Sequence, residues 1–468
     1  MFSNYHMNIM KNKIESETKM NTQIFREYDI RGVADRDLTS STVELIGKAY
    51  GTFLKRQKKT VISLSRDCRV SSPRIHEAFL KGVLSTGVNV YDIGLTTTPC
   101  LYFSIFHLKT QGGVMITGSH NPPDQNGLKM CIDTASLFGS QIQELKGLIE
   151  KSDFETGQGK VTEKPVLKIY TDYIKGLFKS QNRLKVVVDC GNGMTGMIAP
   201  EVFKSFGHEV IELYTKVDGT FPNHPADPSE PKNLKELIEQ VKVTKAHVGL
   251  AFDGDGDRVG VVDHEGNIIP GDILLILYSR AILAKKKGGT FIADVKCSNL
   301  LFQDIETHGG RAIMWKTGHS LIKAKMKEEK AVLAGEMSGH MFFADRWFGF
   351  DSGIYGACRV LEILDETQKT IPSLLSGVPK TVATPEIRVS CPDDKKFNIV
   401  RRVVESFKTE KYQVVDIDGV RVEFKDGWGL LRASNTQPVL VMRFEAQNEK
   451  RLNEIRQLIE AKVKEFSK

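Results

Sequence analysis

Predicted buried strands alternate with predicted helices through most of this chain, and this alternation restricts its fold more than any other feature. Residues 61–64 (VISL) form an apolar run of strand length, a helix is predicted from about Pro73, and residues 88–91 (VNVY) form the next strand. The same order begins again at residues 184–189 and at residues 290–294. Because strands that alternate with helices favour a mostly parallel sheet covered by helices, we predict repeated α/β units.

The chain is too long for one hydrophobic core. Its 468 residues should divide into three or four domains, since domains commonly contain roughly 100–150 residues. The polar stretch 151–164 and the segment 374–382 are the predicted boundaries. Beyond the second boundary the pattern changes to strand, helix, hairpin and C-terminal helix. The first 21 residues are polar with several methionines, and we expect a disordered extension there.

Composition and charge exclude several functional classes. The net charge of +7 is modest, and no dense block of lysine and arginine is interleaved with aromatic residues, so nucleic acid is not an expected partner. The seven cysteines are scattered without a C-x-x-C pair, which favours a reducing, cytoplasmic location. No apolar run approaches the ~20 residues that a transmembrane helix needs, so no membrane is expected either.

A serine stands at the end of a predicted strand. Residues 117–122 (TGSHNP) follow the apolar run 113–116, Gly118 permits a sharp turn, and Pro122 stiffens the exit. The Ser119 hydroxyl would then lie where open α/β sheets place their chemistry. A simple turn explains the same residues equally well.

Three aspartates alternate with glycines directly after another predicted strand. If this segment is extended, Asp253, Asp255 and Asp257 point to one side and repel one another unless a cation lies among them. Oxygen ligands select Mg²⁺ or Ca²⁺. An EF-hand is excluded because Arg258 and His264 occupy positions that need Gly and Glu. Mg²⁺ is therefore favoured, and a solvated acidic turn is the alternative.

Further polar segments suit a phosphorylated, hydroxylated ligand. Residues 432–436 (RASNT) offer a guanidinium, hydroxyls and an amide for a phosphate, although a polar hairpin loop is an equal alternative. Glu336 and Ser338 form a polar patch of the size of a sugar. His319 and His340 each follow a glycine-bearing turn and could carry protons, but a single histidine is more often structural.

A competing function rests on residues 191–196 (GNGMTG). This G-x-G-x-x-G follows a strand, precedes a helix predicted from Ile198 to Phe206, and has Glu212 about 20 residues further on, as in dinucleotide-binding folds. An NAD-binding oxidoreductase would leave the aspartate and serine loops unexplained. A metal-dependent phosphatase with Ser119 as nucleophile is a second alternative.

Taken together, the motifs resemble the α-D-phosphohexomutase family, most closely its bacterial phosphomannomutase/phosphoglucomutase branch. The resemblance runs from about residue 25 to 445 and rests on four segments in order: 117–122, 253–258, 335–340 and 432–438. It implies an α/β fold in which three similar α/β domains and a C-terminal α+β domain surround a central cleft. The expected domains are 22–163, 164–267, 268–379 and 380–468, after the extension at 1–21.

The resemblance also implies a role for individual residues. Ser119 would be the phosphorylated serine, and its phosphate would join Asp253, Asp255 and Asp257 around Mg²⁺. The residues implied around the transferred group and its protons are Arg31, Lys129, Arg258, His319 and His340. Those implied to hold the substrate are Lys296, Glu336 and Ser338, and, at its other phosphate, Arg432, Ser434, Asn435 and Thr436.

The implied reaction moves a phosphoryl group between C1 and C6 of mannose or glucose phosphate, through a phosphoserine and a hexose 1,6-bisphosphate that also activates the enzyme. A phosphoglucosamine mutase of the same family is the alternative, although that branch carries Gln where Met337 stands. We expect a monomer or a dimer. Ser65 and the pair Asp351–Ser352 depart from the family pattern, and we expect neither to touch the four segments.

Overall fold

The computed structural model describes residues 20–435 and 437–467. Most of the expected extension at residues 1–21 therefore lies outside the described residues, as does Thr436. The described chain begins at the short 3₁₀ helix η1 (Thr22–Ile24), which is capped by the Asn21 side chain. Within the described residues, no helix combines the length and the apolar character needed to cross a membrane.

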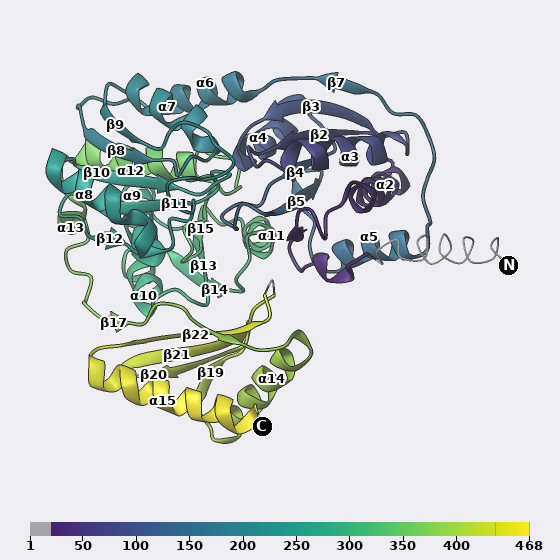
Figure 1. Cartoon of the computed structure of the whole chain (residues 1–468). Coiled ribbons are helices and arrows are strands. Elements are labelled where there is room, and N and C mark those ends of the chain that lie inside the picture. The colour runs from purple at the N-terminus through teal and green to yellow at the C-terminus, as the bar shows by residue number, and fades with distance from the viewer. Residues whose placement is uncertain (1–19, 436, 468) are drawn as a thin grey trace.

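The first unit is a mixed sheet flanked by helices, coloured purple to blue in Figure 1. Its central strands β2, β3 and β4 run parallel, whereas β1 and β5 are antiparallel to their neighbours. The strands in spatial order are β1 (Ile30–Val33), β5 (Gln125–Ile132), β4 (Gly112–Ile116), β2 (Val61–Arg66), β3 (Asn89–Leu95) and β7 (Val161–Glu163), with β6 (Ala135–Ser136) beside β5. The helices are α2 (Ser40–Arg56), α3 (Ser72–Leu84), α4 (Thr98–Leu108) and α5 (Ser140–Glu150).

The second unit repeats the parallel pattern and ends in a hairpin. Strands β8 and β9 lie parallel, β10 lies parallel to β8, and β10 pairs antiparallel with β11. The strands in spatial order are β12 (Ile268–Ile269), β11 (Val259–Asp263), β10 (Val248–Phe252), β8 (Lys185–Asp189) and β9 (Glu209–Leu213). The helical segments are α6 (Leu167–Leu177), η2 (Met194–Met197), α7 (Ala199–Ser205), η3 (Pro231–Leu234) and α8 (Lys235–Thr244).

The third unit is a four-stranded sheet of the same kind. Its strands in spatial order are β14 (Arg311–Trp315), β13 (Thr290–Asp294), β15 (Leu333–Gly335) and β16 (Met341–Phe343). Its helices are α9 (Gly271–Lys285), α10 (Asn299–Thr307), α11 (His319–Glu329), α12 (Gly353–Thr367) and α13 (Ile371–Leu374). The prediction of three repeated α/β units is therefore confirmed.

The last unit is different, as predicted. Its strands pair antiparallel throughout, and the unit lies apart at the bottom of Figure 1, with the turn between β21 and β22 reaching toward the rest of the molecule. The strands are β17 (Val382–Ala383), β18 (Ile387–Ser390), β19 (Gln413–Val415), β20 (Val420–Phe424), β21 (Gly427–Ala433) and β22 (Val439–Ala446). The helices are α14 (Asp393–Thr409) and α15 (Glu449–Phe466).

The apolar cores show how the units are joined. The largest cluster of buried residues runs from Phe103 on α4 through Val186 on β8 to Tyr355 on α12, so it links the first three units. The last unit has its own cluster, around Val403 and Phe444. A small buried cluster of Val295, Trp428 and Leu430 joins the third unit to the last. The last unit is therefore a separate body that is attached to the others through an interface.

Candidate active site

The Ser119 loop leaves the end of β4 in a constrained turn. Thr117 Oγ1 accepts a hydrogen bond of 2.9 Å from the Ser119 backbone N–H, and Ser119 adopts a left-handed φ of 50°. A Cβ added at Gly118 would lie 2.5 Å from Arg69 Nε, so only glycine fits there. The loop therefore holds the serine hydroxyl in one place.

The buried side chain of Arg69 holds this loop in place, a role that was not predicted from the sequence. Its Nη2 donates to the carbonyl oxygens of Ser119 (2.8 Å) and Asn121 (2.6 Å), and its Nη1 to those of Pro122 (2.6 Å) and Gln125 (3.1 Å). Arg69 is 1% exposed. The one signal in the sequence was a charged cluster, residues 66–69, directly after a strand.

The aspartate loop after β10 is a tight turn, so the alternative of an extended segment does not apply. Asp253 Oδ1 accepts from the backbone N–H groups of Gly256 (3.0 Å) and Arg258 (3.1 Å), and Gly256 has a φ of 79°. The turn still brings one oxygen each of Asp253, Asp255 and Asp257 within 4.8 Å of one another. All three side chains are buried.

These three carboxylates carry a strong local field. Burial and the neighbouring Asp257 hold the pKa of Asp253 well above its ordinary value. Lys129 Nζ lies 2.7 Å from Asp255 and also contacts Asp257. Burial would lower the pKa of Lys129, but the attraction of Asp255, Asp257 and Asp253 together outweighs it and raises that pKa. One lysine only partly offsets three carboxylates, so further positive charge would be stabilising here.

Two oxygens of the loop are free to bind an ion. Asp255 Oδ1 and Asp257 Oδ1 are buried and have no hydrogen-bond partner in the part of the chain that the structure describes. Ser119 Oγ donates to Asp253 Oδ2 over 2.8 Å, so the hydroxyl adjoins the same space. An all-oxygen set of this kind suits a hard divalent cation, and the donors present could hold one.

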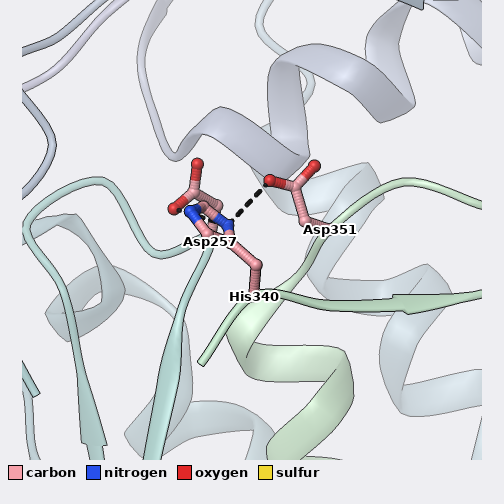
Figure 2. Close-up of side chains that lie close together, drawn as sticks. All are labelled: Asp257, His340 and Asp351. Atoms are coloured by element: carbon pink, nitrogen blue, oxygen red, sulfur yellow. Dashed lines mark ion pairs between the residues drawn. The ribbon is translucent and has the colours of Figure 1, made fainter. Parts of the chain in front are cut away.

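His340 lies at the centre of the charged groups (Figure 2). Its Nδ1 lies 3.0 Å from Asp351 Oδ2 and 3.5 Å from Asp257 Oδ1, and its Nε2 accepts a 3.0 Å hydrogen bond from Arg258 Nε. These partners place the proton of a neutral His340 on Nδ1 and the lone pair on Nε2. The expectation that Asp351 touches none of the four segments was wrong, because the turn before α12 brings it back against residue 340.

His319 lies beside His340, with ring centroids 5.8 Å apart and planes at 25°. Burial, with a smaller contribution from the cation Lys323, lowers the pKa of His319 well below its ordinary value. His120 was also missed: its Nδ1 lies 3.2 Å from Ser119 Oγ. Burial and Arg258 lower the pKa of His120, so both histidines are neutral near pH 7.

Two more residues support the site from outside the four segments. Thr98 Oγ1, at the start of α4, donates to Asp255 Oδ2 over 2.5 Å. Arg31 on β1 pairs with Asp29, with 2.9 Å between Nε and Oδ1. Burial would lower the pKa of Arg31, but Asp29 raises it further, so the guanidinium stays charged.

The segment predicted to hold the sugar lies next to His340. Glu336 Oε1 accepts from the Gly318 N–H over 2.5 Å, and Ser338 Oγ donates to Glu336 Oε2 over 3.3 Å. Lys296 lies after β13, where its Nζ contacts Glu386 at 2.7 Å. Burial would lower the pKa of Lys296, but the attraction of Glu386 raises it, so this lysine is a cation on the third unit.

The segment predicted to hold the second phosphate faces the same region from the last unit. Arg432 Nε pairs with Asp418 at 3.0 Å, and Ser434 Oγ accepts from the Gln437 N–H over 3.1 Å. Asn435 Nδ2 donates to Tyr28 Oη over 2.6 Å, which links the last unit to the first. The remaining predicted residue of this segment, Thr436, lies outside the described residues.

The Gly-rich motif at residues 191–196 packs against protein. A Cβ at Gly196 would lie 2.0 Å from the carbonyl oxygen of Thr215, and one at Gly193 would lie 2.9 Å from Gly254. Glu212 pairs with Lys204 on the surface. The glycines thus permit close contact between two loops, and the NAD-binding alternative is not favoured.

Comparisons with known proteins agree with this site. Family models described as phosphoglucomutase/phosphomannomutase, alpha/beta/alpha domains I, II and III and C-terminal domain match residues 22–156, 168–266, 270–382 and 386–462. A phosphomannomutase/phosphoglucomutase from Pseudomonas putida is 47% identical over 440 residues, covering 94% of this chain and 95% of the relative. A phosphoglucomutase from Neisseria meningitidis serogroup A is 44% identical over 445 residues, covering 94% and 96%.

A solved structure is similar over almost the same length. The crystal structure of a phosphoglucomutase/phosphomannomutase family protein from Burkholderia thailandensis superimposes with a TM-score of 0.90 at 41% identity, covering 96% of this chain and 98% of that one. The four-unit architecture is therefore shared with that protein.

Proposed function

This chain belongs to the phosphoglucomutase/phosphomannomutase family of hexose-phosphate mutases, and we propose that Ser119 is the residue that carries the transferred phosphoryl group. One observation carries the proposal: Ser119 Oγ is held by a constrained loop 2.8 Å from Asp253 of the aspartate loop. A phosphate on this hydroxyl would adjoin the unpartnered oxygens of Asp255 and Asp257.

We propose Mg²⁺ as the ion held by Asp253, Asp255 and Asp257 together with the phosphate on Ser119. Mg²⁺ supplies positive charge that offsets the negative charge spreading over the phosphoryl oxygens during transfer. Lys129 and Arg258 add cationic groups on the protein side. Because these groups are already in place, little reorganisation is needed when charge develops.

In the proposed reaction, a sugar hydroxyl oxygen attacks the phosphorus of phosphoserine 119, and the bond from phosphorus to Ser119 Oγ breaks. His340 takes the hydroxyl proton on Nε2 after Arg258 Nε–H, which occupies that lone pair in the structure, moves to the phosphoryl group, while Asp351 stabilises the resulting imidazolium at Nδ1. The product is a hexose bisphosphate. It must reverse its orientation so that its other phosphate returns to Ser119 and restores the phosphoenzyme.

We propose that Glu336 and Ser338 bind sugar hydroxyls and that Lys296 contacts the substrate. The distal phosphate would be held by a set of polar residues on the last unit: Arg432, Ser434, Asn435 and Thr436. We also propose a monomer or a dimer, and a cytoplasmic location, which the seven free cysteines support.

The proposed substrates are mannose and glucose phosphates, which differ only at C2. A pocket that discriminates by shape alone separates substrates by ~10–200-fold, so kcat/KM for the two 1-phosphates should agree within about two orders of magnitude. Glucosamine 1-phosphate should be poorer, because its ammonium group would enter a region in which bound Mg²⁺ would lie beside the cations Lys129, Arg258 and Lys296. A coupled assay with all three sugar phosphates tests this. A preference for glucosamine 1-phosphate would place the chain in the phosphoglucosamine mutase branch of the family.

The role of Ser119 is tested with Ser119→Ala and, as control, Ser376→Ala at an exposed position. Intact-mass measurement of purified wild-type protein should show a fraction heavier by one phosphate, absent from Ser119→Ala and present in Ser376→Ala. Turnover should fall by at least about 1000-fold only in Ser119→Ala. Full turnover in Ser119→Ala would show that another group carries the phosphate.

A further inference from the structure

A cavity lies between the first and third units, and no residue of the Ser119 loop lines it. It has a volume of about 480 Å³ and is lined from α4, from the β5–β6 turn, from α11 and from the segment 344–350. This is within the ~300–1,000 Å³ typical of small-molecule sites. We propose that this cavity binds an aromatic ligand that carries an anionic group, and that the bound ligand influences the active site.

Aromatic rings form one side of the cavity. The Phe106 and Phe348 ring centroids lie 4.8 Å apart, and Phe348 stacks on Phe350 at 5.7 Å. Phe106 is 36% exposed, which is unusual for a ring that belongs to an aromatic cluster. A planar apolar group placed against these rings would remove them from water and stack on them.

Another part of the lining is cationic. Lys323, Lys327 and Lys330 contribute to it from α11 and the residue after it, and none of the described residues that line the cavity is acidic. Lys327 and Lys330 are exposed and form no ion pair within residues 20–435 and 437–467. Tyr102, which is 4% exposed, also lines the cavity, and its hydroxyl lacks a hydrogen-bond partner among these residues. This surface therefore favours an anion that also accepts hydrogen bonds.

A short chain of contacts connects the cavity with the active site. Lys323 Nζ lies 4.1 Å from the centroid of the Tyr102 ring and 3.1 Å from Asp351 Oδ1. Asp351 Oδ2 in turn lies 3.0 Å from His340 Nδ1. A ligand anion near Lys323 competes with Asp351 for that ammonium group, which alters the carboxylate that orients His340. By linkage, a substrate that shifts His340 alters the ligand affinity by the same factor.

Binding is tested on the full chain with 1-anilinonaphthalene-8-sulfonate, an aromatic anion, and with N-phenyl-1-naphthylamine, which has the same rings without the sulfonate. Wild-type protein should bind the sulfonate more tightly, with saturable fluorescence. The double variant Lys327→Glu/Lys330→Glu should weaken sulfonate binding about tenfold and leave the neutral probe little changed. Phe106→Ser should weaken both probes.

The matched control is Lys286→Glu/Lys287→Glu, the same charge change at exposed positions of the same unit. It should leave binding of both probes at wild-type strength. Equal weakening by the two lysine pairs, or probe binding that neither Lys327→Glu/Lys330→Glu nor Phe106→Ser alters, would overturn the site. Unchanged circular dichroism and thermal midpoint establish that each variant is folded.

Coupling is tested by measuring mutase turnover with and without saturating anilinonaphthalene sulfonate. Wild-type turnover should change at least twofold, and Lys323→Met, which removes the ammonium but keeps the apolar stem, should lose that response while still binding the probe. Turnover that stays constant in wild-type protein with the site filled would overturn the coupling.

Discussion

At the scale of single residues, the aspartate loop concentrates more negative charge than its protein neighbours offset. Asp253, Asp255 and Asp257 are all 0% exposed, and the nearby cations are Lys129 and, at 4.0 Å from Asp253, Arg258. Buried carboxylates held this close are costly unless a cation joins them. A cation bound at this loop would therefore stabilise it.

The first prediction concerns the proposed Mg²⁺ ion at the aspartate loop. Asp255→Asn keeps the shape of the side chain but removes a charged ligand, so kcat should fall by at least about 100-fold and the Mg²⁺ concentration for half-maximal activity should rise. EDTA should abolish wild-type turnover and added Mg²⁺ should restore it. The control Asp35→Asn, at an exposed carboxylate, should match wild type. Undiminished turnover of Asp255→Asn in EDTA would contradict the proposed site.

The second prediction concerns Asp351, which contacts both His340 and Lys323. Asp351→Asn removes the charge that stabilises and orients the His340 ring, so kcat should fall roughly 10–100-fold while KM changes little. Steady-state kinetics measure both constants. Asp345→Asn, a nearby carboxylate paired with Arg359, is the control. A rise in KM with unchanged kcat would place Asp351 in substrate binding instead.

At the scale of elements, strand ends deliver the chemical groups and buried side chains fix the loops that follow them. Ser119 follows β4 and the aspartate loop follows β10, whereas Arg69 lies in the connection from β2 to α3. The carbonyl groups of an irregular loop lack the hydrogen bonds of a helix or sheet. The Arg69 guanidinium supplies hydrogen bonds to them instead.

The third prediction follows from this brace. In Arg69→Lys the single ammonium group cannot reach four carbonyl oxygens at once, so the free energy of unfolding should fall by about 1–3 kcal/mol and kcat should fall with it. Urea denaturation and turnover measure the two effects. Arg36→Lys, at a side chain that is 72% exposed, should change neither. Wild-type stability in Arg69→Lys would mean that the loop is held by other contacts.

The fourth prediction concerns the ion pair between Lys296 and Glu386, which joins the third unit to the last. The attraction of Lys296 lowers the pKa of Glu386 to about 2, below its ordinary value. The ionised carboxylate thus stabilises the folded state above about pH 4.5, and this contribution is lost as the pH falls toward 2. Glu386→Gln should lower the urea midpoint at pH 7.

The difference in urea midpoint between wild type and Glu386→Gln should narrow as the pH is lowered from about 5 to 3, because the Glu386 carboxyl of the unfolded chain binds a proton there while the folded carboxylate, with its pKa of about 2, does not. Glu410→Gln, at an exposed carboxylate that pairs with Lys462, is the control and should have little effect at pH 7. If the difference in urea midpoint grew as the pH was lowered, Glu386 would not stabilise the fold through its ionised carboxylate.

At the scale of the whole molecule, the last unit docks through polar contacts around a small apolar cluster of Val295, Trp428 and Leu430. Arg421 stacks on Trp428, 3.7 Å from the ring centroid, and donates to the carbonyl oxygens of Val295 and Cys297. Beside His319, Tyr28 Oη accepts from Asn435 and donates to the Thr317 carbonyl over 2.7 Å. Tyr28 thereby joins the first, third and last units.

The fifth prediction tests whether Tyr28 holds the cleft closed. Tyr28→Phe removes both hydrogen bonds, so the last unit should open more readily, KM should rise about 5–10-fold, and the bisphosphate should be released more often before it reorients. Small-angle scattering should give a larger radius of gyration. Tyr173→Phe, at a ring that is 39% exposed, should behave as wild type. An unchanged KM and radius of gyration would show that other contacts hold the last unit against the first and third units.

Much of this organisation could be predicted from local sequence. The strand and helix alternation, the serine at the end of β4 and the three aspartates after β10 are local patterns, because turn residues and apolar periodicity act over a few positions. The different character of the last unit was visible in the same way. The four segments also indicated a hexose-phosphate mutase before their spatial relation was known.

What only the tertiary structure decided depends on contacts between distant residues. The 191–196 motif has the spacing of a cofactor loop, but the approach of residues 215 and 254 fills the space beside its glycines. The aspartate loop turns instead of extending, because Asp253 captures its own backbone N–H groups. Arg69 and Asp351 matter through partners 50 and 11 positions away, Ser119 and His340. Sequence periodicity reports which face of an element is buried, whereas the partner that covers that face is selected only when the chain packs.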